Sequence, residues 1–549
     1  MKKFLIVLLS MAGTSAYIHA QPPCSPVVVI DSDISSNTTL SASNLYRIQG
    51  CVSITAGNTL TIPAGTVITF ANNDNLMVEP GAYIQASGTS AAPIEFTSTA
   101  AVGSRVPLSN AGLIIRGNAA INESSLTLPC SKTHTAGSTA ADSSGVMTYV
   151  RFSYLSGSAG VTYLDNALSL VGVGNKTKIE HIQISKSANN GLGIIGGEQR
   201  MKEVLVLDSK KSDVYIGLGA QPQIQTLLTL KKDLTMHDVV GTYGMLIENN
   251  RSTPGATPFT RPVISNASIV GPWQCDPLSV SSDYKDGILL RNNARADIYN
   301  TVVAFHNQYG LYIQDNATAQ NTASTPNALN VAYSSFTNNA SGDYGQGTFT
   351  WSGNGCSSSM ADWIAGFTAV GCEETGNQFA PVDLAYDASF CADFCNPNFV
   401  QDFVLDASNT VLDAPDYTAS VLASFDALDY RGAVQETDLY APWSMLCPQN
   451  KISCTRSALK GETQATTLML YPNPAQAYTE VQFHAEQTGI ATVAIMDKVS
   501  GKVWMEKRVV IESKGQQNIP LGIKSLPENV YTVRLILKDK VLYGQLVVK

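Results

Sequence analysis

Short apolar segments separated by glycine, asparagine and serine recur through most of this 549-residue chain. Residues 60–68 (LTIPAGTVI) are echoed sixteen positions later by residues 76–84 (LMVEPGAYI). Residues 182–194 and 204–216 repeat a strand, turn and strand at a spacing of twenty-two. Short β-branched strands with a period of about twenty residues predict a solenoid, whose coils bury their apolar faces only by stacking.

A parallel β-helix fits this pattern. Inward Val, Ile and Leu side chains stack between coils, small or polar residues occupy the corners, and asparagines can form ladders. A chain of immunoglobulin-like sandwiches is the alternative, but it should show a domain boundary about every hundred residues. Because no such boundary occurs before about residue 456, we predict one parallel β-helix body over residues 21–455.

The pattern changes near the C-terminus. Residues 492–496 (TVAIM) and 530–537 (VYTVRLIL) alternate with period two, and Ser-Gly and Lys-Gly pairs punctuate the segments between them. This alternation predicts a small antiparallel sandwich of about seven strands over residues 471–549, joined to the body by a linker over residues 456–470.

Several spaced motifs in this last stretch point to a known family. They are Tyr471-Pro472-Asn473-Pro474, the segment from Asp497 to Lys502 with Gly501, the LPENVYTVRL segment with Tyr531, and the terminal KVLYGQLVVK. In this order they closely resemble the C-terminal sorting domain of the type IX secretion system. The resemblance implies a cargo carried across the outer membrane by that machinery, with removal of the domain by a sorting peptidase and attachment of the cargo to surface lipopolysaccharide. Asn529 stands where relatives carry glycine, which predicts a looser turn.

The body also resembles a known family, over most of residues 50–434. The segments that carry the resemblance are residues 50–68, 79–98, 112–122, 193–198, 261–271 and 426–434. They are similar to right-handed β-helix surface proteins that travel with the same sorting domain. The resemblance implies an all-β chain, with a right-handed parallel β-helix followed by a small immunoglobulin-like β-sandwich.

The N-terminus has the pattern of an export signal. Lys2 and Lys3 precede the apolar run 4–9, and small or neutral residues follow as far as Ala20. This predicts a signal peptide over residues 1–20, with a buried strand as the alternative. No apolar run reaches the ~20 residues of a membrane helix. Charged residues make up 14% of the chain against about 25% in typical domains, which argues against disorder and coiled coil.

All ten cysteines follow the predicted signal, and an even number in an exported chain indicates disulfides. They are Cys24, Cys51, Cys130, Cys275, Cys356, Cys372, Cys391, Cys395, Cys447 and Cys454. Metal binding is the rival interpretation, but no CxxC motif occurs. Proximity in sequence suggests the pairs 24–51, 356–372, 391–395 and 447–454, which leaves 130 with 275.

Tryptophans and cysteines also interrupt the repeats at about residues 272–286 and 340–400, around Trp273, Trp351 and Trp363. These stretches are predicted to be disulfide-pinned loops that project from the solenoid. Loops on a rigid scaffold often carry binding function.

Catalytic chemistry has little support in the sequence. Polysaccharide hydrolysis needs carboxylates clustered across neighbouring coils, and lyases need calcium-holding acids beside a base. Relatives carry acidic groups at positions matched here by Asn189, Asn190 and Gly193, and one coil later by Lys211, Ser212, Asp213 and Tyr215. Only Asp213 remains acidic. His181 and His237 fit hydrogen-bonded corner positions better than catalytic ones, and no GxSxG or Walker motif occurs.

Charge adds a further hypothesis. The chain has 35 basic and 44 acidic residues; subtracting 2 and 0 for the signal and 10 and 7 for residues 463–549 leaves 23 and 37, a net charge of −14. Residues 296–430 contain fifteen acids and no Lys or Arg. The acids either solvate the surface or bind calcium, for which the candidates are Asp383, Asp387, Asp393, Asp402 and Asp406. An acidic body argues against nucleic acid as a partner.

The leading hypothesis is a non-catalytic adhesin, or a glycan-binding or matrix-binding module, displayed at the cell surface or released. A carbohydrate-active β-helix enzyme with an atypical site, either a polysaccharide lyase or a glycoside hydrolase, is the alternative. No cofactor other than calcium is a candidate. The ligand is expected to be an extracellular glycan or protein.

Overall fold

The computed structural model describes residues 25–100, 104–157, 163–274, 279–323, 328–351, 359–366, 375–380, 415–434, 440, 442–447, 468–485, 487–497, 502–511, 513–537 and 541–549. The chain divides into two compact units, residues 1–455 and 456–549. The predicted signal peptide and residues 456–467 of the predicted linker lie outside the described residues.

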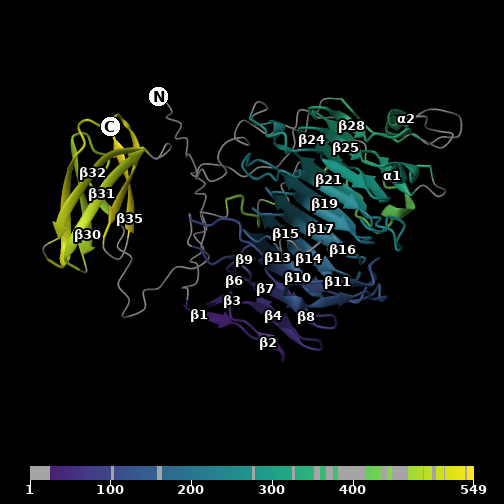
Figure 1. Cartoon of the computed structure of the whole chain (residues 1–549), viewed down its shortest axis with the longest axis horizontal. Helices are drawn as coiled ribbons and strands as arrows, with labels where there is room; N and C mark the ends of the chain where they lie inside the picture. Colours follow the sequence, from purple (N-terminus) through teal and green to yellow (C-terminus); the bar gives the residue numbers. More distant parts are fainter. Residues whose placement is uncertain are drawn as a thin grey trace, which may run out of the picture. The chain divides into compact units, whose positions relative to one another are not determined.

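The first unit is a parallel β-helix built from two long sheets, which we call the wide sheet and the narrow sheet. Figure 1 shows their strands stacked side by side from β1 to β28. The wide sheet contains β1 (Ser25–Ile30), β2 (Thr38–Thr39), β3 (Asn44–Ile48), β5 (Thr59–Pro63), β6 (Val67–Phe70), β8 (Tyr83–Ser87), β9 (Ile94–Ser98), β13 (Gly145–Ser153), β15 (Lys178–Ser185), β17 (Arg200–Leu207), β19 (Gln223–Leu230), β21 (Val263–Val270), β23 (Ala296–Tyr299), β24 (Val302–Ala304), β26 (Leu329–Ala332) and β27 (Ser335–Thr337).

The narrow sheet contains β4 (Cys51–Ile54), β7 (Asn75–Val78), β10 (Gly112–Arg116), β14 (Asn166–Val171), β16 (Asn190–Ile195), β18 (Ser212–Gly217), β20 (Tyr243–Glu248), β22 (Ile288–Arg291), β25 (Tyr309–Ile313) and β28 (Gly342–Gln346). A separate hairpin pairs β11 (Ser125–Thr127) with β12 (Thr133–Thr135). Short helical turns are α1 (Asn316–Gln320), α2 (Met360–Ala365), η1 (Pro129–Ser131), η2 (Pro272–Gln274) and η4 (Ser420–Leu422).

The strand register confirms the twenty-two-residue repeat. Ile182 of β15 lies opposite Val204 of β17, and Leu192 of β16 lies opposite Val214 of β18. The sixteen-residue echo has a different meaning, because Leu60 belongs to the wide sheet and Leu76 to the narrow sheet. Leu60 stacks on Ile84 instead. That echo therefore reflects two similar strands in different sheets and not the same strand position in two stacked coils.

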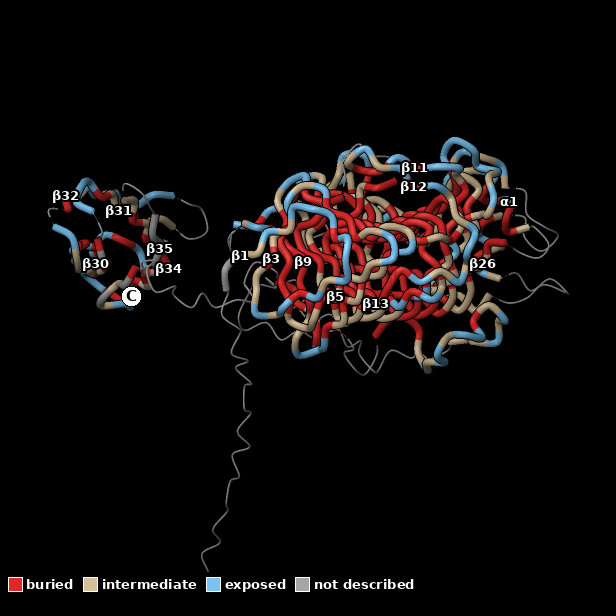
Figure 2. The backbone as a smooth tube through the Cα atoms, turned by 90° about the horizontal axis from the view of Figure 1, so that it is seen from below, coloured by how far each residue is buried: buried red, intermediate tan, exposed pale blue. Residues whose placement is uncertain are grey.

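Inward side chains fill the space between the sheets. Figure 2 shows the buried backbone of the solenoid running along its interior. Phe96 stacks on Phe152 with ring centroids 4.9 Å apart, and Phe70 lies 6.2 Å from Phe96 on the other side. Each inward residue thus packs on its counterpart in the neighbouring coil, as a solenoid core requires.

The long strands of the wide sheet bend at one residue per coil. His181, Glu203, Thr226 and Asn266 occupy this corner with φ of 54° to 55°, in the left-handed region. The His181 Nε2 atom lies 2.7 Å from Glu203 Oε2 of the next coil, and its ring stacks on Tyr149 at 4.0 Å. His181 is therefore a polar corner residue, as the sequence indicated.

Residues 415–434, 440 and 442–447 form what we call the strap, which returns along the outer side of the wide sheet. Glutamine side chains of the wide sheet bind the backbone of the strap through both the nitrogen and the oxygen of their amide groups. The Gln225 amide donates to Asp426 O at 2.6 Å and accepts from Asp426 N at 3.1 Å. Gln183 makes the same pair of bonds with Met445, at 2.5 and 2.7 Å. Each amide therefore acts as a strand partner for the strap.

The strap also covers apolar side chains that point away from the solenoid core. The outward residues are Leu205, Leu207, Leu228, Leu230 and Val270, and the strap residues over them are Ala433, Val434, Tyr440, Trp443 and Leu446. Burying these leucines removes apolar surface from water at about 25 cal/mol per Å². The strap thus completes a second, external hydrophobic layer.

One predicted loop differs from the expectation. Residues 342–346 form β28, the last strand of the narrow sheet. Trp351 and Trp363 lie against the main core with Phe379 and do not project from it. Since an open solenoid end would expose its core, these aromatic side chains close that end. Cys275, Cys356, Cys372, Cys391 and Cys395 lie outside the described residues, so the pinning of the loops stays a prediction.

The second unit is an antiparallel β-sandwich with seven described strands, as predicted. One sheet contains β29 (Met469–Tyr471), β30 (Tyr478–Ala485) and β33 (Gly515–Gly522). The other contains β31 (Gly489–Asp497), β32 (Val503–Ile511), β34 (Asn529–Ile536) and β35 (Val541–Val548). Alternate residues of both sheets meet in one core that includes Val493, Val533 and Tyr531.

Candidate ligand-binding face

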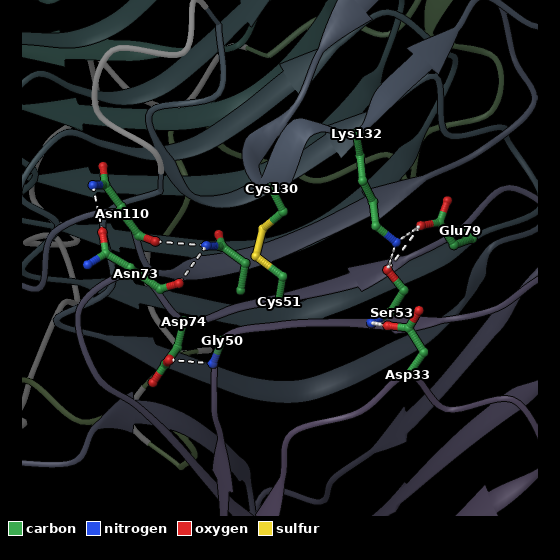
Figure 3. Close-up of a disulfide and its surroundings, with 11 residues drawn as sticks. Asp33, Gly50, Cys51, Ser53, Asn73, Asp74, Glu79, Asn110, Cys130 and Lys132 are labelled. Carbon is green, nitrogen blue, oxygen red and sulfur yellow. Dashed lines mark hydrogen bonds and ion pairs between the residues drawn. A yellow bond between two sulfur atoms is a disulfide. The ribbon is translucent and has the colours of Figure 1, made fainter.

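A disulfide-pinned hairpin covers the first coils of the narrow sheet. Cys51 of β4 and Cys130 of η1 form a disulfide across 79 residues of sequence, with the surroundings drawn in Figure 3. The expected pairs 24–51 and 130–275 are therefore wrong. Proximity in sequence failed as a guide because the solenoid brings Cys51 under a hairpin that belongs to a later coil. Cys447 is also disulfide-bonded, and its expected partner Cys454 lies outside the described residues.

Ion pairs close the same region. The Lys132 Nζ atom lies 2.8 Å from Glu79 Oε1 and donates to Ser53 Oγ at 2.5 Å, as Figure 3 shows. Arg116 pairs with the other Glu79 oxygen. Burial raises the pKa of Glu79, but the hydrogen bond from Lys132 and the charge of Arg116 outweigh it and hold the pKa below its usual value. Every charge here has a protein partner, so this covered region is structural.

Beyond the hairpin, the outer side of the narrow sheet presents a different set of side chains. Tyr215, Leu246, Leu289 and Tyr312 are register neighbours on β18, β20, β22 and β25. Glu248 and Arg291 are neighbours in the adjacent row. We call these two rows, with Arg251 and Tyr163 beside them, the open face. The Arg251 side chain is 43% exposed.

Glu248 is the centre of the open face. Its side chain is fully buried, and its two oxygens accept from four donors. Tyr215 Oη lies 2.8 Å and Arg251 Nε 2.5 Å from Oε1, while Arg291 Nε lies 2.7 Å and Asn292 Nδ2 3.1 Å from Oε2. A carboxylate that accepts this many charge-assisted bonds is a clamp that holds the two guanidinium groups in place.

Aromatic rings support the same arginine. The Arg251 guanidinium lies 4.9 Å from the ring centre of Tyr163 and 5.8 Å from that of Tyr215. The Tyr215 ring lies over Gly217, where a Cβ atom would come within 2.3 Å of Oη. Burial, and then the charge of Glu248, raise the pKa of Tyr215 well above its usual value, so its hydroxyl stays a donor. Gly217 is thus required for the flat ring.

The two arginines present donors to solvent on a rigid support, whereas the rings of Tyr163 and Tyr215 beside Arg251 are buried. The terminal nitrogens of Arg251 and Arg291 make no hydrogen bond to the described residues. Tyr243, Tyr309 and Tyr312 are half-buried nearby, and the rings of Tyr309 and Tyr312 stack at 5.4 Å. Rings and guanidinium groups side by side suit a ligand with both apolar faces and acceptor atoms.

The acidic candidate Asp213 lies on β18, two residues before Tyr215, but it is not exposed. Its side chain is fully buried, 3.0 Å from Lys231 Nζ, which also donates to Ser209 O at 2.8 Å. Burial raises the pKa of Asp213 to about 7, against the charge of Lys231. A carboxylate enclosed with its own counter-ion is not in reach of an external ligand.

The matched neighbours of Asp213 form a side-chain ladder. Asn190 Nδ2 donates to Asn166 Oδ1 at 3.1 Å, and the Ser212 N–H donates to Asn190 Oδ1 at 3.0 Å. His237 lies apart from both sites, with Nδ1 2.9 Å from Asp283 Oδ2. These positions therefore stabilise coils and are not brought together as a site.

The calcium candidates Asp383, Asp387, Asp393, Asp402 and Asp406 lie outside the described residues, so calcium binding there stays a prediction. Within the described part of the chain, no three His, Cys, Asp or Glu side chains are placed to hold a metal ion.

The sorting motif is brought together in the sandwich. Asn473 Oδ1 accepts from the Val547 N–H at 2.8 Å, and the Ala475 N–H donates to Val547 O at 2.8 Å. The PNP turn, Pro472 to Pro474, therefore contacts the last strand. Tyr531 is buried in the core and its hydroxyl donates to Pro527 O at 2.7 Å. Gly501 lies outside the described residues, as does the side chain of Tyr471.

Asn529 stands where relatives carry glycine, and its side chain makes a hydrogen bond there. Its Nδ2 donates to Asp497 Oδ2 at 3.2 Å, across the neighbouring strand. This hydrogen bond links the start of β34 to the end of β31. It therefore opposes the loosening of the turn that the replacement of glycine predicted.

A second feature lies where the strap meets the wide sheet. A cavity of about 280 Å³ is lined by Glu180, Arg200, Met201, Lys202, Gln223, Gln225, Ser424, Phe425 and Asp426. The sequence did not indicate this cavity, because its two sides are more than two hundred residues apart.

The stacked parallel sheets define the first unit as a parallel β-helix. The chain belongs to the pectate-lyase-like β-helix family, whose domain model matches residues 32–368. Residues 469–549 match the secretion system C-terminal sorting domain. The protein is therefore exported across the outer membrane by the type IX machinery, to the cell surface or the extracellular space. Among the described residues, no helix is long and apolar enough to cross a membrane.

No curated protein matches this chain significantly. Among solved structures, the full-length tailspike protein 2 of the Escherichia coli O157:H7 bacteriophage CAB120 matches with 8% identity and a TM-score of 0.18. The match covers 91% of this chain and 64% of the tailspike.

The residues of the open face were missed by the sequence reasoning. Glu248, Arg251 and Arg291 follow no fixed spacing, since Val214 pairs with Met245 and Met245 with Ile288 across coils of unequal length. One weak signal was present, because Glu248 and Arg291 each end an apolar strand segment of similar pattern.

Proposed function

We propose that this protein is a surface-displayed binding module that holds an extracellular glycan on the open face. The observation that carries the proposal is the Glu248 clamp, which orients Arg251 and Arg291 on the face that also carries the half-buried rings of Tyr243 and Tyr312. Sugar rings combine an apolar face with hydroxyl groups, so aromatic rings and guanidinium donors match both parts.

Binding is favoured over hydrolysis by the state of the carboxylates. General acid or base catalysis needs a carboxyl group free to exchange a proton with the substrate. Glu248 has its oxygens engaged by four donors, and Asp213 is enclosed with Lys231. The alternative, a carbohydrate-active enzyme, would need carboxylates from other parts of the chain.

A glycan array probed with the purified body tests this function. We expect selective binding that Arg251→Gln and Arg291→Gln each weaken by tenfold or more, because each removes a set of donors at the centre of the face. Arg295→Gln is the matched control, since Arg295 lies over Phe259 at 3.6 Å outside the open face. Equal binding by all three variants would place the glycan elsewhere, and release of shortened glycan would favour the enzyme.

We also propose that the sorting domain is removed after export and that the body remains attached to surface lipopolysaccharide. The PNP turn and buried Tyr531 of a separately folded sandwich support this address role. Intact mass of the protein from the cell surface should lack about the first twenty and the last eighty to ninety residues, and a lipopolysaccharide adduct should add mass to the new C-terminus. An uncut C-terminus in cells with an active sorting peptidase would contradict the proposal.

A further inference from the structure

The cavity between the strap and the wide sheet is formed by parts far apart in the chain. Two rows of long polar side chains cross β15, β17 and β19 in register: Lys178, Arg200 and Gln223, then Glu180, Lys202 and Gln225. The strap tip, Ser424 to Asp426, lies over them. Its position is set by the two Gln225 bonds to Asp426 and by the Ser424 hydroxyl, 2.9 Å from Gln223 Oε1.

The charged side chains that line the cavity are paired, with one exception, and Lys178 beside the cavity is the partner of Glu180. Lys178 Nζ lies 3.0 Å from Glu180, and Lys202 pairs with Asp426. Arg200 is exposed and makes no hydrogen bond or ion pair with the described residues. A guanidinium has five N–H donors in a planar fork, and two of them match the two oxygens of a carboxylate. The unpaired group therefore offers a bidentate site for a carboxylate.

The size of the cavity limits the ligand. Sites for drug-sized molecules have volumes of about 300–1,000 Å³, so 280 Å³ accommodates one sugar ring or one amino acid. Half-buried Phe425 offers an apolar wall, and the remaining oxygens of Glu180 and Asp426 can accept from hydroxyl or ammonium groups. The lining thus matches one small unit that bears a carboxylate together with hydrogen-bond donors.

We propose that this cavity binds a single carboxylate-bearing unit, with its carboxylate on Arg200, and that occupancy holds the strap against the wide sheet. The site is separate from the open face and does not depend on the proposed glycan-binding function. A ligand that contacts both Arg200 and the strap tip binds only the docked strap, so it shifts the strap toward that state by mass action.

Titration calorimetry of the full chain without its predicted signal peptide, with the sandwich still attached, tests the ligand class with glucuronate, glutamate and glucose. We expect glucuronate or glutamate to bind, and the stronger of the two identifies an acidic sugar or an amino acid as the source of the carboxylate. Glucose, which lacks the carboxylate, should bind at least tenfold more weakly. Equal binding of glucose, or no binding of either acid at millimolar concentration, would overturn the proposal.

Two arginine variants locate the site. Arg200→Gln should weaken binding of the acid at least tenfold, and Arg200→Lys should restore part of it, since lysine keeps the charge but loses the fork. Arg295→Gln is the matched control and should leave this binding unchanged, since Arg295 lies over Phe259 outside both the cavity and the open face. If Arg200→Gln binds as well as the wild type, the carboxylate is not on Arg200.

Hydrogen exchange tests the effect on the strap. The bound acid should slow amide exchange in residues 415–434 several-fold, and it should leave the exchange of the sandwich unchanged. The same ligand with Arg200→Gln should give no protection. Binding without any slowing in the strap would overturn the second part of the proposal and leave the site itself standing.

Discussion

The outer sides of the two sheets differ in how their outward-pointing apolar residues are shielded from water. Both carry apolar residues that point away from the solenoid core, such as Leu228 on the wide sheet and Leu289 on the narrow sheet. On the wide sheet, a returning chain segment covers them. On the open face, tyrosine rings and arginine stems of the sheet itself lie beside them.

This difference separates a structural surface from the proposed binding surface. Leucine has no polar atom and needs a cover, whereas tyrosine and arginine bury their apolar parts and keep polar ends in water. The strap therefore contributes stability, and the open face keeps donors available for a ligand. The comparison predicts large stability effects on one side and small ones on the other.

Trp443→Ala should be the most destabilising change. Trp443 is 2% exposed, and its ring centroid lies 6.0 Å from that of Tyr440 and 5.7 Å from that of His181. Loss of this side chain should lower the free energy of unfolding by about 3–5 kcal/mol. Tyr312→Ala on the open face removes only a half-buried ring and should cost less, about 1 kcal/mol. Denaturant unfolding of the body measures both. Equal losses would break the distinction between the two faces.

Asp286→Asn should change how stability depends on pH at the border of the open face. Asp286 is buried and accepts from the Tyr309 N–H at 3.0 Å, and burial raises its pKa to about 7. The folded protein thus binds more protons than the unfolded chain between about pH 4 and 7, so the contribution of Asp286 to stability falls as pH rises through this window.

The Asp286→Asn variant isolates the contribution of Asp286 to the pH dependence of stability. The wild type should lose stability relative to Asp286→Asn by about 1.4 kcal/mol per pH unit, with about 4 kcal/mol as the upper limit between pH 4 and 8. Thermal unfolding of both proteins across this range measures the difference, and other groups cancel in it. A difference that stays constant with pH would mean that Asp286 keeps an ordinary pKa.

Removal of the Cys51–Cys130 disulfide should expose the covered coils of the narrow sheet. The double variant Cys51→Ala with Cys130→Ala should lose about 2–4 kcal/mol, because a link across 79 residues restricts the unfolded chain. The hairpin residues Leu126 and Leu128 should also become accessible to protease. Unchanged stability and cleavage would show that the hairpin stays in place without the bond.

Gln183→Glu should give the smallest of these effects. The carboxylate cannot donate to Met445 O, so one strap bond is replaced by a repulsive contact, at a cost of about 1–3 kcal/mol. Gln314→Glu, at an exposed position after β25, is the control and should be neutral. Similar losses in both would show that the amide bonds to the strap contribute little.

Part of the fold was predictable because stacked coils carry similar residues at equivalent positions, which produces a repeat in the sequence. Ile182 and Val204 occupy the same position in successive coils of equal length, so the repeat and the register coincide. The disulfide was mispaired because chain distance does not measure spatial distance in a solenoid. The strap was missed because it has no repeat, and its contacts join residues as far apart as Gln183 and Met445, 262 positions away.

The sequence by itself determined the C-terminal sorting domain, the parallel β-helix, the terminal sandwich and the acidic balance of the body. These follow from local patterns, since strand propensity, alternation and spaced motifs are properties of short segments. The tertiary structure alone decided which polar residues meet. Glu248 reaches Arg291 and Arg200 faces the strap tip only because coils of unequal length stack in register and a distant segment folds back over them.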